Sequence, residues 1–276
     1  MTDERIAEYL KALENEERAA ATIEKYRRAL LNFAVFLSGA AVTQEMIRLW
    51  KDDLRARNYV PSTINTYLAA LNGFFHFCGW SDCRARFLKI QRRLFRDSRQ
   101  ELTRAEYERL VAAAEAAGDR ALALLMETIC STGIRVSEVK YLTVEAAQCG
   151  RAEVALKGKI RTVLLPAKLC RKLLKYAKKQ KIARGEIFLT TDGKGMDRRQ
   201  IWAAMKRLCQ RAGVAPSKVF PHNLRHLFAA AYYRAYRDIV KLADLLGHSS
   251  IETTRIYLVE SGAEHQRQLE RLGLVS

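Results

Sequence analysis

Residues 222–257 read HNLRHLFAAAYYRAYRDIVKLADLLGHSSIETTRIY, and this stretch holds most of the chemically informative side chains of the chain. Three of the five histidines fall here in two short motifs, His222-Asn-Leu-Arg225-His226 and Gly247-His248. The spacing of apolar residues predicts three helices, at 224–236, 239–246 and 252–258. A guanidinium fork matches the oxygens of a phosphate, so Arg225 between two histidines predicts an anion-binding site carried on helices.

A zinc site is the alternative for this motif, because His222 and His226 are four residues apart. A metalloprotease helix places its glutamate base directly after the first histidine, where this chain has Asn223, and Arg225 would put a cation beside the metal. A second set, His76, Cys78 and Cys83, lacks a fourth ligand and fits no familiar zinc spacing. We therefore expect no metal.

The composition is that of a soluble, helix-rich globular protein: 276 residues, 49% hydrophobic and 28% charged, with 14 Gly and four Pro. Collagen-like, disordered and low-complexity classes are excluded. No run approaches the ~20 apolar residues that cross a bilayer, and the first ten residues are too charged for a signal peptide. The six cysteines form no CxxC pair. We expect a cytoplasmic protein with reduced thiols and no membrane partner.

The charge is strongly positive and unevenly distributed. Lys and Arg number 48 against 30 Asp and Glu, a net charge of +18. Residues 151–211 carry 18 basic and four acidic side chains, a net of +14, whereas residues 1–95 carry 15 and 11, a net of +4. Such a segment repels itself unless a polyanion neutralises it, so nucleic acid is the leading partner. A solvated basic face that aids solubility or touches anionic lipid is the alternative.

The length favours two domains. Apolar residues recurring every three or four positions predict a helical first domain at 1–90, with helices at 22–37, at 43–57 and from Pro61 onward. Residues 89–99, KIQRRLFRDSR, are basic and show no sustained periodicity, so we place an interdomain linker at 91–101.

The second domain is predicted at 102–276. A capping box at Thr103 and Glu106 opens its first helix, and a helix at 121–132 stops at Gly133. Segments 152–157 and 160–165 flank Gly158 as a β-hairpin, and helices follow at 167–181 and 198–211. The predicted fold is therefore mainly α with one small β-hairpin.

Four motifs occur in a definite order along the chain: Gly133-Ile-Arg135-Val-Ser-Glu138, Leu156-Lys157-Gly158-Lys159, His222-Asn-Leu-Arg225-His226 and Leu245-Leu-Gly-His248-Ser-Ser-Ile-Glu-Thr-Thr-Arg-Ile-Tyr257. In this order they resemble the tyrosine site-specific recombinases, also called the phage-integrase family. Ala21-Thr-Ile-x-x-Tyr26 and Ser62-Thr-Ile-Asn65 look like the core-binding domain of that family, so the resemblance covers nearly the whole chain. The layout is most similar to the minimal two-domain, Xer-like members, and we expect no arm-binding domain before Thr22.

The resemblance implies a recombinase whose two domains close as a clamp around DNA, the first of them core-binding. Tyr257 would attack the scissile phosphate and form a covalent 3′-phosphotyrosyl intermediate. Arg135 and Arg225 would clamp the transition state, which removes the need for a metal ion, ATP or any cofactor. His222 would take the tyrosine proton as general base, and His248 would hydrogen-bond the phosphate.

The general acid implied by the resemblance is a lysine on the hairpin, which would protonate the departing 5′-oxygen. The hairpin turn looks shorter than in other family members and Lys159 lies nearby, but we prefer Lys157. Glu138 either orients Arg135 or is a helix-surface carboxylate, and His226 is expected to support the site without taking part in the chemistry. Three rival tyrosines on a long helix are expected to be core or interface residues: Tyr232, Tyr233 and Tyr236.

The implied partner is double-stranded DNA with paired target sites. By resemblance, residues 258–276 would dock as an exchange tail on a neighbouring protomer and assemble a homo-tetramer, the alternative being a tail folded on its own domain. The biological task would be integration or excision of a mobile element, or resolution of chromosome dimers. An accessory factor would set the direction of the reaction. Two other functions stay open: DNA relaxation by a type IB topoisomerase, and DNA binding without catalysis.

Overall fold

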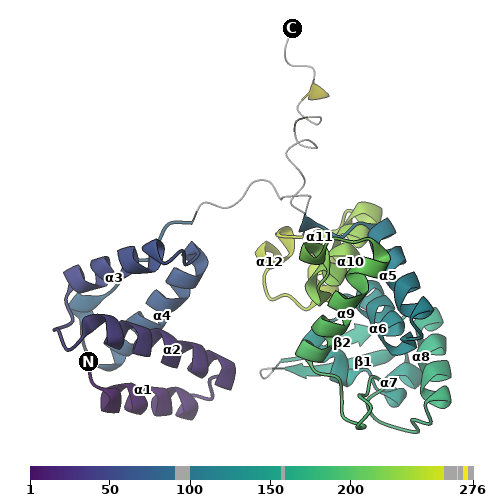
Figure 1. Cartoon of the computed structure of the whole chain (residues 1–276), viewed down its shortest axis with the longest axis horizontal. Coiled ribbons are helices and arrows are strands. Elements are labelled where there is room, and N and C mark those ends of the chain that lie inside the picture. The colour runs from purple at the N-terminus through teal and green to yellow at the C-terminus, as the bar shows by residue number, and fades with distance from the viewer. Residues whose placement is uncertain (91–99, 157–158, 258–265, 267–269, 273–276) are drawn as a thin grey trace. The chain divides into compact units, whose positions relative to one another are not determined.

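Amphipathic helices build the first of the two units into which the chain divides, Met1–Arg92 and Arg93–Ser276 (Figure 1). The computed structural model describes residues 1–90, 100–156, 159–257, 266 and 270–272. Unit 1 contains α1 (Asp3–Asn15), α2 (Ala20–Leu37), α3 (Gln44–Ala56), α4 (Pro61–Phe77) and the short η1 (Ser81–Cys83). Helices α2 to α4 match the predicted ranges to within two residues, whereas α1 was not predicted as a helix.

The core of unit 1 is aromatic and aliphatic. Trp50 on α3 is fully buried, packs its ring 4.8 Å from that of Phe33 and donates its indole N–H to the Asn32 side chain at 3.0 Å. Leu68 and Phe74 of α4 are also fully buried in this cluster. The stripes seen in the sequence are therefore the faces that the helices turn toward one another.

Two asparagines of α4 hold the chain that follows this helix. Asn65 exchanges two hydrogen bonds with the backbone of Leu88, at 2.8 and 3.0 Å, and Asn72 does the same with Ala85, at 2.7 and 3.0 Å. The Gln44 side chain donates to two further carbonyls of this stretch. Each asparagine amide thus pairs with one residue as a neighbouring strand would, so the chain is fixed against unit 1 as far as Leu88.

Unit 2 is helical around one hairpin. Its described elements are α5 (Arg104–Ala116), α6 (Arg120–Thr132), η3 (Val136–Tyr141), α7 (Val144–Cys149), β1 (Arg151–Leu156), β2 (Lys159–Leu164), α8 (Ala167–Lys179), α9 (Arg198–Ala212), η4 (Pro216–Lys218), α10 (Pro221–Tyr236), α11 (Ile239–Leu246) and α12 (Ile251–Arg255). The mainly α fold class with one small hairpin is confirmed. No described helix is both long and apolar enough to span a membrane.

Caps explain several helix boundaries in unit 2. The predicted capping box is present: the Thr103 side chain accepts from the Glu106 backbone, and the Glu106 carboxylate accepts from the Thr103 backbone. Helix α6 ends at Gly133, whose φ of +65° is the left-handed conformation that favours glycine. The chain therefore turns sharply just before Arg135.

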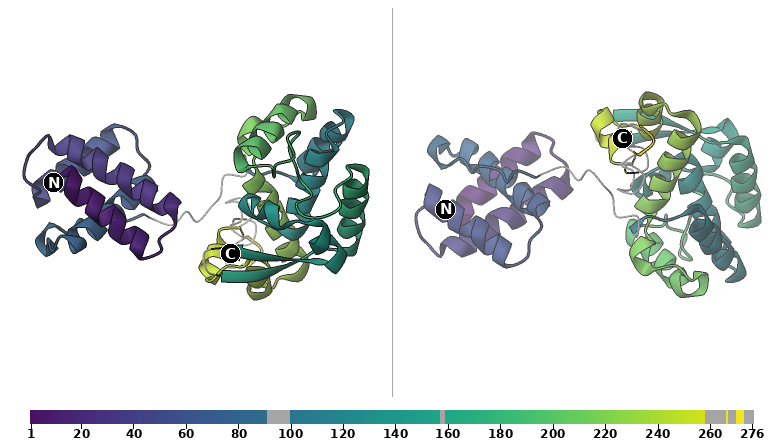
Figure 2. Two further views of the ribbon diagram at one scale, coloured as in Figure 1. Left: turned by 90° about the horizontal axis from the view of Figure 1, so that it is seen from below. Right: turned by 90° about the horizontal axis from the view of Figure 1, so that it is seen from above.

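Strands β1 and β2 form the predicted antiparallel hairpin, and Leu156 pairs with Lys159. Each strand begins and ends one residue earlier than expected, so residues 157 and 158 connect them, and both lie outside the described residues. Alternate side chains are buried against the core, among them Val154 and Val163, while Ile160 is exposed. Figure 2 shows the hairpin beside the end of the unit that carries α11 and α12.

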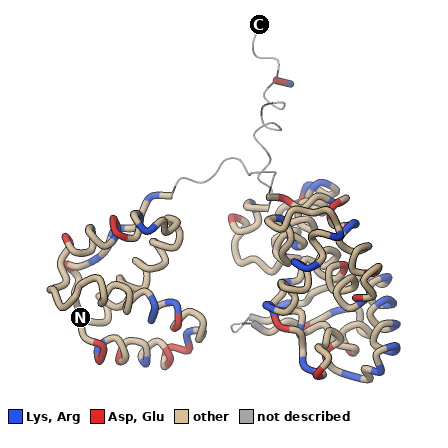
Figure 3. The backbone as a smooth tube through the Cα atoms, in the orientation of Figure 1, with Lys and Arg blue, Asp and Glu red and all other residues tan. Residues whose placement is uncertain are grey.

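Several expectations fall where the chain is not described. They are residues 91–99 of the linker, Lys157, and most of the carboxyl-terminal tail. Helix α12 is described from Ile251 to Arg255, within the predicted 252–258 apart from its first residue. Figure 3 shows basic residues along α8 and α9 of unit 2, in keeping with the charge of residues 151–211.

Candidate active site

Three of the four motifs singled out in the sequence meet at one end of α10, and the lysine of the fourth lies outside the described residues. Helix α10 carries His222, Arg225 and His226. The loop between α11 and α12 carries His248, and Tyr257 is the second residue after α12. The left-handed turn at Gly133 brings the end of α6 against α10, since Arg225 donates to the Gly133 carbonyl. Residues from separate motifs therefore lie close together, and we call the site formed by Arg135, Arg225, His248 and Tyr257 the phosphate pocket, after the anion that the sequence predicts there.

Arg225 is a buried cation that has no counter-ion in the part of the chain that the structure describes. It is 1% exposed and donates to the carbonyls of Gly133 and Leu246, the latter at 2.8 Å. Among the described residues, its Nε finds no acceptor and no carboxylate forms an ion pair with it. Burial, and next the nearby charge of Arg135, lower the pKa of Arg225 to about 10, so it is cationic at neutral pH. A desolvated, uncompensated guanidinium favours binding of an anion.

His248 holds this guanidinium in place. Its Nε2 lies 2.9 Å from Nη2 of Arg225 and its Nδ1 lies 2.9 Å from the Thr254 hydroxyl. Because an arginine only donates, Nε2 must accept, and the imidazole proton is therefore on Nδ1 and directed to Thr254. Burial, followed by the charges of Arg225 and Arg135, lowers the pKa of His248 to about 4. The imidazole is thus neutral near pH 7.

Tyr257 is enclosed by histidine rings and is 6% exposed. Its ring stacks on His248, with 5.6 Å between centroids and 9° between planes, and lies 4.2 Å from His226 and 5.7 Å from His222. The Tyr257 side chain is also close enough to the guanidinium of Arg225 to act on the pKa of that arginine. The phenolic oxygen is therefore beside both a cation and potential proton acceptors.

Glu138 is fully buried and joins two arginines. One carboxylate oxygen accepts from Nη1 of Arg135 at 3.0 Å, and the other accepts from Nη2 of Arg161 at 2.5 Å and from the Arg135 backbone at 2.9 Å. Burial alone would raise the pKa of Glu138, but the hydrogen bonds from Arg161 and Arg135 outweigh it and lower the pKa below its usual value. Glu138 is therefore the residue that orients Arg135, and not a surface carboxylate.

Sequence reasoning did not identify two residues of this pocket, Arg161 and Thr254. Arg161 lies on β2 two positions before the buried Val163, so the strand alternation turns it toward the interior. An arginine on the inward face of a strand signals a buried ion pair. Thr254 is fully buried and precedes Tyr257 by three residues, about one turn of the chain. Nothing in its local sequence points to a contact with His248.

The remaining candidates are placed as follows. Lys157 lies outside the described residues, and only the backbone of Lys159 is described. Tyr232 and Tyr233 are half-buried against the cluster of Ala229, Leu242, Leu246 and Tyr257, and Tyr236 is exposed. These three tyrosines stay on α10, whereas Tyr257 is in the pocket.

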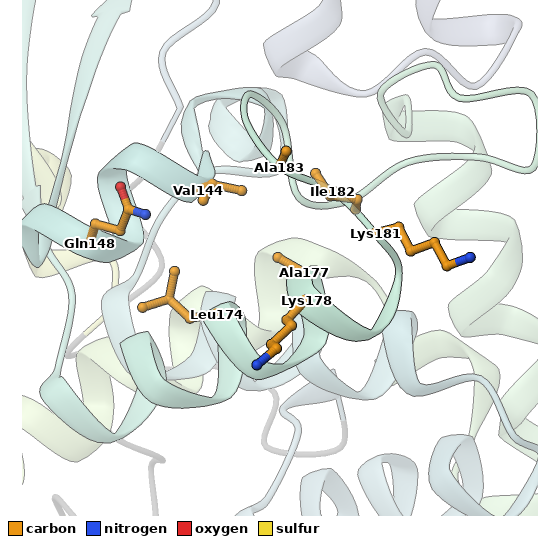
Figure 4. A pocket seen from close by; sticks show the side chains of 8 residues that line it. All are labelled: Val144, Gln148, Leu174, Ala177, Lys178, Lys181, Ile182 and Ala183. Atoms are coloured by element: carbon orange, nitrogen blue, oxygen red, sulfur yellow. The ribbon is translucent and has the colours of Figure 1, made fainter.

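A separate pocket lies between α7 and α8. Figure 4 shows apolar side chains such as Leu174 and Ile182 around it, with Lys178 and Lys181 directed away from its interior. It contains none of the residues of the phosphate pocket. In the parts of the chain that the structure describes, no three His, Cys, Asp or Glu side chains gather as metal ligands.

Comparison with known proteins gives the same result for both units. Residues 100–263 match the phage integrase family, and residues 6–81 match the phage integrase N-terminal SAM-like domain. The chain is 34% identical to tyrosine recombinase XerD of Brucella melitensis, covering 87% of this chain and 88% of the relative, and 30% identical to tyrosine recombinase XerC of Roseiflexus castenholzii, covering 92% and 88%.

The fold is also shared with solved structures. A lambda integrase tetramer bound to a Holliday junction is similar with a TM-score of 0.74 and 18% identity, covering 92% of this chain and 76% of that one. The matched ranges include all the residues that gather at the end of α10, in the order in which the sequence presents them. The chain belongs to the phage integrase family of tyrosine recombinases.

Proposed function

We propose that this protein is a site-specific DNA recombinase that breaks and rejoins strands through a covalent link between DNA and Tyr257. The observation that supports this most directly is the uncompensated guanidinium of Arg225 beside the hydroxyl of Tyr257. A phosphodiester brought to this pocket would supply the missing negative charge and place its phosphorus next to the nucleophile.

The chemical step is an in-line displacement. The Tyr257 oxygen forms a bond to phosphorus while the bond from phosphorus to the 5′-oxygen breaks, which leaves a 3′-phosphotyrosyl link and a free 5′-hydroxyl. Negative charge grows on the non-bridging oxygens, and Arg135 and Arg225 are the cations that would bind them. The link conserves the bond energy, so another 5′-hydroxyl can attack it and exchange strands without ATP.

Two protons must move in this step. The tyrosine proton passes to His222, which we retain as the base, although the His226 ring lies closer to Tyr257. The 5′-oxygen needs a proton to leave, and Lys157 is the proposed donor. His248, neutral and bonded to Arg225, would fix the guanidinium. Both of its ring nitrogens are engaged here, so its predicted hydrogen bond to the phosphate would require the proton to lie on Nε2 in the DNA complex, in place of the hydrogen bond from Arg225.

The proposed assembly is a homo-tetramer on two copies of a duplex target. The structural relative bound to a Holliday junction is a tetramer, and the family match extends to residue 263, into the tail. We propose that residues 258–276 dock on a neighbouring protomer, that unit 1 and unit 2 bind DNA as core-binding and catalytic domains, and that an accessory factor sets direction. A cytoplasmic location is part of the same proposal, because the proposed substrate is cellular DNA.

A covalent-trapping experiment tests the chemistry. The purified protein is incubated with a nicked suicide substrate with and without a chelator, denatured, and analysed by gel and mass spectrometry. A DNA adduct on Tyr257 that forms in the presence of chelator, and is lost in Tyr257→Phe, is the expected result. Tyr236→Phe is the matched control, because this exposed tyrosine lies on α10. An adduct that persists in Tyr257→Phe would refute the assignment.

The topoisomerase alternative shares the nucleophile and the arginines but rejoins the original strand. Supercoiled plasmids with and without paired target sites separate the two activities. Products joined between sites are expected for a recombinase, whereas relaxation of every plasmid without joined products would favour the topoisomerase. A protein that binds DNA and forms no adduct would favour the non-catalytic alternative.

A further inference from the structure

Arg161 connects the hairpin to two other parts of unit 2. Its Nη2 donates to Glu138 at 2.5 Å and its Nη1 donates to the Leu245 carbonyl at 3.0 Å. Glu138 in turn holds Arg135, and Leu245 is at the end of α11, three residues before His248. One guanidinium on β2 is therefore bonded both to Glu138, which holds Arg135, and to the end of α11, which leads to His248.

The stem of Arg161 is fitted to the chain beneath it. A Cβ added to Gly247 would overlap Cδ of Arg161 and lie 2.9 Å from its Nε. The side chain of Arg161 is 16% exposed, and its Nε finds no acceptor among the described residues. Glycine at 247 therefore meets two requirements, a left-handed φ of +63° and room for this arginine.

Arg161 is also near the outer limit of the anchored part of the hairpin. It faces Val154, which is buried, and the Tyr141 hydroxyl donates to the carbonyl of Ala155 on the same strand. One position further out, Ile160 is 77% exposed. From Arg161 to Lys159, where β2 begins, the strand spans only about 7 Å.

We propose that Arg161 is a positioning residue for the general acid, and this inference rests on the proposed function. By bonding to Glu138 and Leu245, Arg161 fixes the described part of β2 relative to the phosphate pocket, and the proposed general acid Lys157 would depend on that fixed hairpin to act on the 5′-oxygen. A misplacement of about 1 Å can cost on the order of 100-fold in rate, and a strand attached at its base transmits such a shift to its end.

The test uses two substrates that differ in one atom. In the first the leaving group is the normal 5′-oxygen, and in the second a bridging sulfur replaces it. A thiolate leaves without protonation because the pKa of a thiol is about 8.5, so the sulfur substrate does not need the general acid. Cleavage rates are measured for the parent, Lys157→Ala, Arg161→Met and Arg161→Lys.

We expect Arg161→Met to cleave the oxygen substrate about 100-fold more slowly and the sulfur substrate within about threefold of the parent, as a loss of general-acid catalysis requires. Arg161→Lys keeps the charge but cannot bridge Glu138 and Leu245 with a planar fork, so it is expected to recover little. Equal loss on both substrates would overturn the proposal, because Arg161 would then act on the phosphate. Parental rates on both would overturn it too.

The double variant Lys157→Ala with Arg161→Met gives a second readout. If Arg161 acts through Lys157, adding Arg161→Met to Lys157→Ala slows the oxygen substrate by less than about threefold. Independent, multiplying losses would overturn the proposal. Arg151→Met is the matched control, because Arg151 is an exposed arginine at the far end of β1, and it is expected to cleave both substrates like the parent.

Hydrogen exchange tests the anchoring without requiring cleavage. In Arg161→Met, amides of β1 and β2 are expected to exchange at least about tenfold faster, while those of α6 and α10 stay at parental rates. Unchanged exchange in the hairpin would overturn the proposal, and faster exchange throughout unit 2 would assign Arg161 to general stability instead. A parent protein that forms no Tyr257 adduct would refute the proposed function, and the exchange result would still decide the role of Arg161.

Discussion

Units 1 and 2 are both helical, but their interiors differ in kind. In the described chain the six buried polar or charged residues all belong to unit 2: Thr128, Thr132, Glu138, Asn223, Arg225 and Thr254. Unit 1 instead buries a ring cluster in which Trp50 and Phe33 are fully enclosed. Burial in unit 1 removes apolar surface from water, whereas at the end of α10 it removes charge from water at a cost.

This difference assigns separate tasks to the two interiors. The apolar core of unit 1 contributes stability and positions helices. The pocket of unit 2 keeps Arg225 charged with no counter-ion among the described residues, which costs free energy and suits the phosphate binding that we propose. Substitutions in the first interior should therefore change unfolding, and substitutions in the second should change chemistry.

The largest effect is expected for Trp50→Ala in unit 1. Truncating a fully buried tryptophan leaves a cavity and an unpaired Asn32 amide, so the free energy of unfolding of unit 1 should fall by about 4 kcal/mol. Calorimetry of the full chain measures it as a lower melting temperature. The matched control is Trp202→Ala on α9, where the ring is 49% exposed and about 1 kcal/mol or less is expected. Similar losses in both variants would contradict the comparison.

Arg225→Lys tests the other interior. Lysine keeps the charge but cannot donate to Gly133, Leu246 and His248 together in one plane, so cleavage should slow by about 100- to 1,000-fold. Single-turnover adduct formation measures this rate, and duplex binding is expected to stay near the parental level. A variant that cleaves normally, or that loses activity only because it melts, would remove the distinction between the two units.

Acid should destabilise unit 2 through His248. Its folded pKa of about 4 lies below the unfolded value near 6.5, so the unfolded state binds more protons between these pH values. Stability is therefore complete above about pH 6.5 and falls as the pH drops toward 4, by about 2 kcal/mol after allowing for partial exposure. Denaturant melts across this range should show a weaker fall in His248→Gln. Identical pH profiles for the two proteins would contradict the prediction.

The smallest effect concerns the asparagines of unit 1. Asn72→Ala removes two hydrogen bonds to Ala85 and should lower the free energy of unfolding by about 1–2 kcal/mol. Urea melts of the parent and variant give the value. Asn15→Ala, at an exposed position at the end of α1, is a control outside this contact. Equal stability of Asn72→Ala and the parent would show that these bonds contribute nothing net.

Helix positions could be predicted from the sequence because local patterns determine them. The apolar spacing gave α2 to α4, and the capping box at Thr103 and the stop at Gly133 fixed two boundaries in unit 2. The same spacing is present in α1, where Ile6, Tyr9, Leu10 and Leu13 are buried, but its charged sequence was considered only as evidence against a signal peptide. The strand limits shifted by one residue because alternation defines a face better than an end.

The candidate site could be predicted only as a list of residues. Local sequence and resemblance pointed to Arg225, His248 and Tyr257, but not to the hydrogen bonds between them, because those depend on how separate helices pack. Only the coordinates show that His248 accepts a hydrogen bond from Arg225 and that its other ring nitrogen is bonded to Thr254, three residues before Tyr257. Arg161 could have been predicted from the sequence, because strand alternation puts it on the same inward face as Val163.

The paired asparagines of α4 also bear on the proposed binding of both units to one duplex. Helix α4 ends at Phe77, yet the backbone stays bound to unit 1 up to Leu88, eleven residues further on. A shorter free tether raises the effective concentration of one module near a ligand already held by the other. Once unit 1 is bound to a duplex, Asn65 and Asn72 would thus favour rebinding of unit 2 at the same place over escape into solution.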